Sequence, residues 1–111
     1  MRRIAVRISS PYLAKFLFWG FCVGLMACGH SPPLKEYSLA RVALENAKKN
    51  NASRYASTFF TKAQESYGAA EMNFKKENYG AAKDLFEVSR TYSEKAENQA
   101  RLQKYKLGET D

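Results

Sequence analysis

Small and aromatic side chains recur at every third or fourth position over the last third of the chain, and this spacing is that of an α-helix. The residues concerned are Ala82, Phe86, Ser89, Ser93, Ala96, Ala100 and Gln103. Because an α-helix has about 3.6 residues per turn, such positions share one face. Their alternating steps of four and three residues are heptad-like. The pattern predicts a long helix over residues 79–107 that packs almost parallel to its neighbours.

A second helix is predicted over residues 34–50. Its apolar positions lie at i, i+3, i+4 and i+7. They are Ala40, Ala43, Leu44 and Ala47. Asn50 and Asn51 follow, and asparagine tolerates the left-handed conformation that ends many helices. We expect residues 52–56 to form the turn that comes next.

A third helix is predicted between these two, over residues 57–77. Ser57 and Thr58 are both good N-cap residue types. The apolar stripe consists of Phe59, Ala63, Tyr67, Ala70 and Phe74. Gly68 lies in the middle of this helix, where glycine costs roughly 0.5–1 kcal/mol relative to alanine. We expect it to permit the close approach of a neighbouring helix. Glu77 and Asn78 end this helix, and Asn78 is the expected cap of the next.

The connections between these helices are short, so neighbouring helices must be antiparallel. The predicted fold is all-α: a small up-down-up array of three helices, which is an antiparallel helical hairpin plus an N-terminal helix. Its core is built from alanine and aromatic side chains. At 1.5 Å per residue the last helix is about 42 Å long and exceeds the other two. The last helix therefore projects past the helix predicted over residues 57–77. The residues near or beyond the end of that helix are Leu102, Tyr105 and Leu107.

The N-terminal segment reads as a targeting signal. Basic residues precede an apolar run from Phe16 to Ala27 that is too short, at about 18 Å as a helix, to cross a hydrocarbon core of roughly 30 Å. A basic stretch followed by a short apolar one is typical of a secretory signal peptide. The run ends in a sequence that looks like a bacterial lipobox: Leu25, Met26, Ala27 and Cys28. The resemblance implies cleavage between Ala27 and Cys28 and acylation of the Cys28 thiol.

This interpretation divides the chain into a cleaved signal peptide (1–27), a lipidated cysteine with a short tether (28–33), a helical domain (34–107) and a tail (108–111). Gly29 replaces the aspartate that retains such proteins at the inner membrane, which implies the periplasmic leaflet of the outer membrane in a Gram-negative host. Four of the 18 basic residues lie before residue 28, so 14 remain in the mature chain against 11 acidic ones. Most of the formal charge of +7 therefore belongs to the signal.

The spacing of alanine and aromatic pairs across residues 34–103 resembles the bacterial lipoprotein family DUF4398. The pairs that carry the resemblance are Leu44–Ala47, Tyr55–Ala56, Phe60–Ala63, Tyr67–Ala70, Tyr79–Ala82 and Ala96–Ala100. The resemblance implies a short Ala-rich helical domain behind a lipobox and supplies no catalytic residues. Asn51 and Ser57 stand where glycine and proline are expected. A weaker likeness, on Tyr67-Gly68 and Glu77-Asn78-Tyr79, is to the packing of one tetratricopeptide unit.

Composition argues against several classes of function. The mature chain has a single histidine, His30, in the tether and no thiol other than that of Cys28. We therefore expect no enzyme activity, no catalytic residues, no metal site, no cofactor and no small-molecule substrate. Its lysine pairs are interspersed with acidic residues, and we expect no nucleic-acid partner.

Two functions remain open. The first is a membrane-anchored, non-catalytic adapter that docks an envelope protein or complex through Tyr92, Leu102 and Tyr105. The alternative is a structural lipoprotein that associates with itself or with the cell wall, which the heptad-like last helix favours.

Overall fold

A computed structural model describes residues 31–109, and four helices make up most of them. They are α2 (Leu34–Lys49), α3 (Ala52–Tyr55), α4 (Ser57–Lys75) and α5 (Tyr79–Lys106). The predicted all-α fold is therefore confirmed. The predicted signal peptide, the lipobox-like segment Leu25-Met26-Ala27-Cys28 and Gly29 lie outside the described residues.

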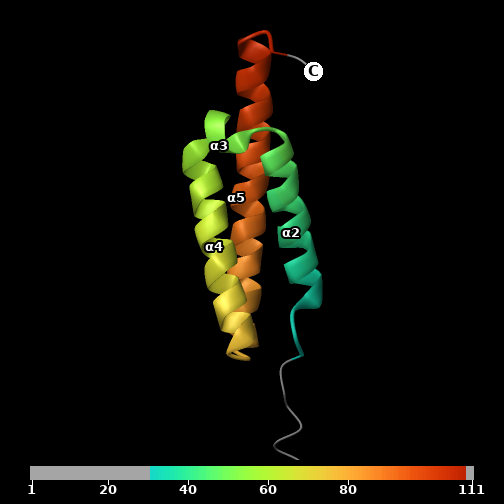
Figure 1. Ribbon diagram of the computed structural model, residues 1–111. Helices are drawn as coiled ribbons and strands as arrows, with labels where there is room; N and C mark the ends of the chain where they lie inside the picture. The colour runs from blue at the N-terminus through green and yellow to red at the C-terminus, as the bar shows by residue number, and fades with distance from the viewer. Residues whose placement is uncertain (1–30, 110–111) are drawn as a thin grey trace, which may run out of the picture. The chain divides into compact units, whose positions relative to one another are not determined.

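Helix α5 is the centre of the domain. Helices α2 and α4 pack along two sides of it and make few contacts with each other, while the short α3 crosses one end of the gap between them (Figure 1). Helices α2 and α5 run in the same direction and α4 runs against both. This is the predicted up-down-up order. The last turns of α5 extend beyond α3 and past the ends of α2 and α4 (Figure 1).

The core of this array consists almost entirely of small residues. Six of the seven stripe positions of α5 are buried: Ala82, Phe86, Ser89, Ser93, Ala96 and Ala100. Gln103, the seventh, is half-buried. Alanines occupy the facing positions, with Ala40, Ala43 and Ala47 on α2 and Ala63 and Ala70 on α4. Small side chains let the helices approach closely, so the packing is tight but contains few large apolar groups.

Aromatic rings fill the space that the alanines leave. At the α3 end, Leu44 and Phe60 are buried, and Phe59 and Tyr92 pack against them. At the other end Phe86 is fully buried under half-buried aromatic side chains from α2 and α4. These are Tyr37, Tyr67 and Phe74, whose ring centroids lie 5.4, 5.7 and 6.5 Å from that of Phe86. Such edge-on pairs add to the stability that burial alone provides.

The turn between α2 and α4 differs in one respect from the prediction. Residues 52–55 form the short helix α3 instead of an irregular turn, and Ala52 is completely buried. Ala56 then takes the N-cap position of α4 without a side-chain hydrogen bond, and Ser57 is the first residue inside the helix. The predicted cap at Ser57 or Thr58 is therefore wrong. Ala52 of α3 and the N-cap residue Ala56 are both buried, and their burial outweighs the preference for a capping hydroxyl.

In each of the three long helices, the second residue after the end of the helix has a left-handed backbone. Asn51, Glu77 and Gly108 have φ of 58°, 61° and 72°. After α4 and α5, the N–H groups of the left-handed residue and of the residue that follows it bond back to carbonyls of the last turn, for example from Glu109 N to Lys104 O at 2.9 Å. This is the pattern of a Schellman motif. The stop predicted at Asn50 and Asn51 is confirmed, because α2 ends at Lys49 and Asn51 is left-handed.

Gly68 does not serve the purpose that its position predicts. A Cβ atom built on it meets no atom within 4 Å, so no neighbouring helix approaches it closely. We expect Gly68→Ala to stabilise the protein by about 0.5–1 kcal/mol, because alanine loses less backbone entropy in a helix. Gly108→Ala is the matched control: its φ of 72° strains any residue with a Cβ and should lower stability. Urea unfolding followed by circular dichroism measures both, and destabilisation by Gly68→Ala would contradict the open environment.

Replacing either of two buried serines of α5 by alanine is expected to change the stability of the protein, but in opposite directions. Ser89 Oγ donates a hydrogen bond of 2.8 Å to the carbonyl oxygen of Ala63 on α4. Ser93 Oγ is buried as well, and no hydrogen-bond partner for it lies among the described residues. Removing an unpaired buried hydroxyl is favourable, so we expect Ser93→Ala to stabilise the protein by about 1 kcal/mol and Ser89→Ala to destabilise it by about 0.5–1 kcal/mol. Equal shifts of the urea midpoint in both variants would argue against this difference.

Candidate functional site

The structure does not bring the three predicted contact residues together. Tyr92 lies more than two turns before Leu102 on α5 and is half-buried. Its ring stacks on Phe59 of α4 at a centroid distance of 6.2 Å. The ammonium groups of Lys62 and Lys95 lie 5.4 and 5.3 Å from the centre of its ring. Tyr92 therefore belongs to the packing between α4 and α5.

The other two predicted contact residues lie in the part of α5 that extends past its neighbours. Leu102 is 52 % exposed and Tyr105 is 74 % exposed. Being three residues apart, they share one side of the helix. Leu107 is also exposed. Glu109 follows the end of α5, and its carboxylate accepts a hydrogen bond from the Tyr55 hydroxyl of α3. The projecting end of α5 thus presents a few exposed apolar and aromatic side chains among charged ones, such as Arg101 and Lys106.

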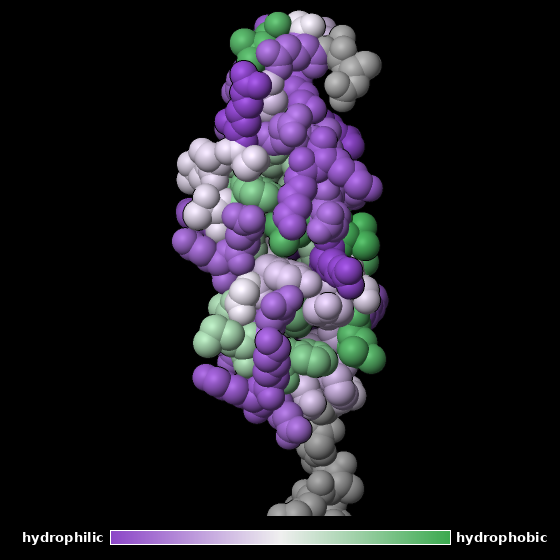
Figure 2. Space-filling view, viewed as in Figure 1, coloured by the Kyte–Doolittle hydropathy of each residue, from purple (hydrophilic) through white to green (hydrophobic). Residues whose placement is uncertain are grey.

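A further apolar surface lies on the outer side of α2. Figure 2 shows hydrophobic side chains over this helix, at the edge of the face that is viewed. Leu39 and Val42 are the exposed apolar residues in the middle of α2, and Val42 is 58 % exposed. They are three residues apart and so lie on one side.

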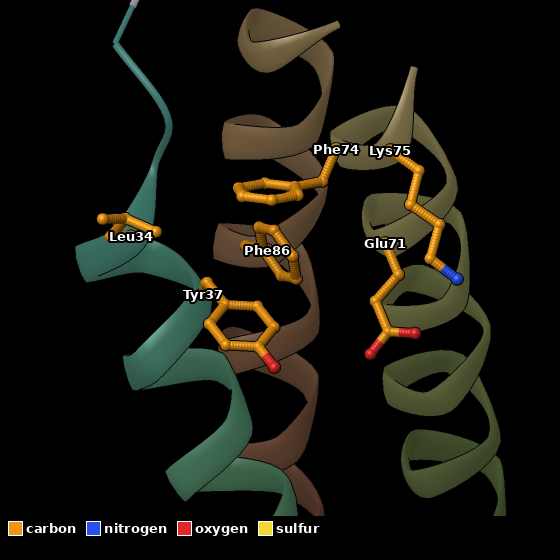
Figure 3. Close-up of a pocket in the computed structure, with 6 residues that line it drawn as sticks. All are labelled: Leu34, Tyr37, Glu71, Phe74, Lys75 and Phe86. Atoms are coloured by element: carbon orange, nitrogen blue, oxygen red, sulfur yellow. The ribbon is translucent and has the colours of Figure 1, made fainter. Parts of the chain in front are cut away.

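A groove that the sequence analysis did not identify lies between the start of α2 and the end of α4, with α5 as its floor. Its volume is about 530 Å³. Figure 3 shows the six residues that line it. They are Leu34, Tyr37, Glu71, Phe74, Lys75 and Phe86. The groove is thus mainly aromatic, with one carboxylate and one ammonium group.

The two charged residues of the groove lie on the same wall. Glu71 and Lys75 are one helical turn apart on α4, and Lys75 is the last residue of that helix. Among the described residues neither of them forms a salt bridge. Burial raises the pKa of the Tyr67 hydroxyl above its usual range, and the neighbouring Tyr37 hydroxyl and Glu71 carboxylate raise that pKa further.

The sequence contained a signal for this groove. In an up-down-up array the start of the first helix, the end of the second and the start of the third meet at one end. Each of these three segments carries an aromatic residue: Tyr37, Phe74 and Phe86. Their convergence was predictable, but the space left between them depends on the weak contact between α2 and α4.

Within residues 31–109, no three side chains of histidine, cysteine, aspartate or glutamate lie where they could share a metal ion. None of the helices described there combines the length and the apolar character that spanning a membrane requires.

Comparison with protein families matches residues 35–108 to a domain of unknown function, DUF4398. The match covers α2 to α5 and the residues of the groove from Tyr37 onward. This chain belongs to the DUF4398 family. Neither the curated proteins nor the solved structures yielded a match. The likeness to a tetratricopeptide unit stays a prediction.

Proposed function

We propose that this DUF4398 protein is a lipid-anchored lipoprotein of the bacterial outer membrane and that its helical domain is a non-catalytic adapter for an envelope protein or complex. The sequence from Phe16 to Cys28 supports the anchor, because a short apolar run is followed by a lipobox-like segment. The exposed end of α5 supports the adapter. A rigid helix that presents Leu102 and Tyr105 beyond the rest of the domain is suited to helix-in-groove recognition.

The anchor is tested by the intact mass of the protein extracted from membranes. The expected mass is that of residues 28–111 plus acyl groups. A Cys28→Ala variant should lack the acyl mass. An unprocessed chain, or a cleaved chain without lipid, would overturn the anchor.

The adapter surface is tested by photo-cross-linking in cells with a benzoylphenylalanine residue at position 105. We expect one dominant cross-linked envelope protein. The same probe at position 91, an exposed site in the middle of α5, should not capture it. Adding Leu102→Ser to the position-105 probe should abolish the cross-link, whereas adding Val42→Ser, an equally exposed apolar change on α2, should preserve it. Absence of a specific partner would overturn the adapter role.

Self-association is the second candidate, and the exposed Leu39 and Val42 on α2 favour it. Sedimentation of the wild-type protein in detergent would then show a dimer that Val42→Ser dissociates. A monomer at all concentrations would exclude this candidate.

A further inference from the structure

The groove between α2 and α4 lies at the end of the domain where the tether enters. Leu34 lines the groove and is the first residue of α2. Cys28 precedes it by six residues, and six extended residues span at most about 21 Å. An acyl anchor on Cys28 would therefore hold this end within about 21 Å of the membrane surface. The other end of α5 lies about 42 Å further along that helix.

We propose that the groove binds the head group of a zwitterionic phospholipid from the membrane in which Cys28 is anchored. The inference rests on the proposed lipid anchor for the source of the ligand. The chemistry of the groove indicates the type of ligand by itself. A volume of about 530 Å³ falls within the range of roughly 300–1,000 Å³ that is usual for small-molecule sites.

The order of the groups along the groove matches the order of groups in a lipid. Leu34 and Phe74 lie towards the tether end, where the glycerol and the first acyl carbons would be. Lys75, at the end of α4, can pair with the phosphate. Glu71, one turn further from the tether end, can pair with the ammonium group beyond the phosphate.

An aromatic wall adds a second interaction with the ammonium group. The half-buried ring of Tyr37 lies across the groove from Glu71 (Figure 3), and it packs edge-on against the fully buried ring of Phe86 at a centroid distance of 5.4 Å. Aromatic faces bind alkylammonium cations, most strongly where water is displaced. The Glu71 carboxylate and the Tyr37 ring together therefore favour a cationic head group over a neutral one. Phosphatidylglycerol offers the phosphate without the cation.

The test is a lipid titration of the full-length protein, processed in cells and purified in detergent. Native mass spectrometry counts bound dioleoyl phosphatidylethanolamine, with dioleoyl phosphatidylglycerol as the comparison. We expect one bound phosphatidylethanolamine and at least fivefold weaker binding of phosphatidylglycerol. Lys75→Glu and Glu71→Gln should each weaken binding of phosphatidylethanolamine at least fivefold.

Lys76→Glu is the matched control, because Lys76 is the next residue, is exposed and does not line the groove. It should change the affinity less than twofold. Circular dichroism confirms that each variant is folded. Equal binding of the two lipids, or equal effects of Lys75→Glu and Lys76→Glu, would overturn the site in favour of general surface adsorption.

The same samples distinguish a failure of the lipid-binding groove from a failure of the proposed lipid anchor. Their intact mass shows whether Cys28 carries acyl groups. Acylation without selective lipid binding would overturn the groove site alone. Selective binding by a chain that is not acylated would overturn the anchor, and with it the membrane of the anchor as the source of the lipid.

Discussion

Phe86→Ala is expected to destabilise the protein by about 3–5 kcal/mol, the usual cost of removing a fully buried phenylalanine ring. The ring is completely buried on α5 and lies against Tyr37, Tyr67 and Phe74. Its removal leaves a cavity that the neighbouring rings, held by their contacts with one another, can fill only in part. A domain of this size has a total stability on the order of 4–12 kcal/mol. Urea unfolding at 222 nm should therefore show a large fall in the midpoint, or a chain that is partly unfolded without denaturant.

Val88→Ala provides the control for this prediction. Val88 lies two residues away on the same helix and is exposed, so its truncation should change the stability by no more than about 0.5 kcal/mol. A loss below 1 kcal/mol for Phe86→Ala would mean that the aromatic cluster is not the centre of the core at this end.

Ala63→Leu is expected to destabilise the protein by about 1–3 kcal/mol for the opposite reason, because there is no room for a larger side chain. Ala63 is completely buried on α4, and its carbonyl oxygen accepts the hydrogen bond from Ser89 of α5. The two helices are therefore too close to admit three more carbon atoms without separating. Loss of the α4–α5 contact would also separate Phe59 from Tyr92.

Ala69→Leu is the matched control on the same helix. Ala69 is only half-buried, and its side chain does not belong to either core cluster. The leucine should be tolerated within about 0.5 kcal/mol. The same urea experiment compares the two variants. If they lose equal stability, close packing at Ala63 is not the reason.

The helices were predictable because their apolar period is unambiguous. The stripe from Ala82 to Ala100 could be read directly, and each of its members is buried. Asn51 could be predicted as a helix end because asparagine is among the few residues that adopt a positive φ at low cost. Local chemistry decides both features, so one sequence was sufficient.

The features that were missed depend on contacts between helices. Gly68 suggested a close approach, but its side of α4 faces away from the other helices. Tyr92 lies at the edge of the apolar face of α5, where periodicity cannot distinguish an exposed contact from a ring that packs on Phe59. The groove exists because α2 and α4 are held apart on α5, and no pattern within a single helix records that separation.

The parallel course of α2 and α5 determines how the domain would respond to mechanical force. The described segment enters at the start of α2 and leaves at the far end of α5, so the two ends lie on opposite sides of the domain (Figure 1). Tension between them acts along the axes of both helices and loads the α2–α5 interface in shear. In this geometry many side-chain contacts must slide at once before the helices part. A protein pulled from both ends would thus resist extension through its alanine stripe instead of opening one contact at a time.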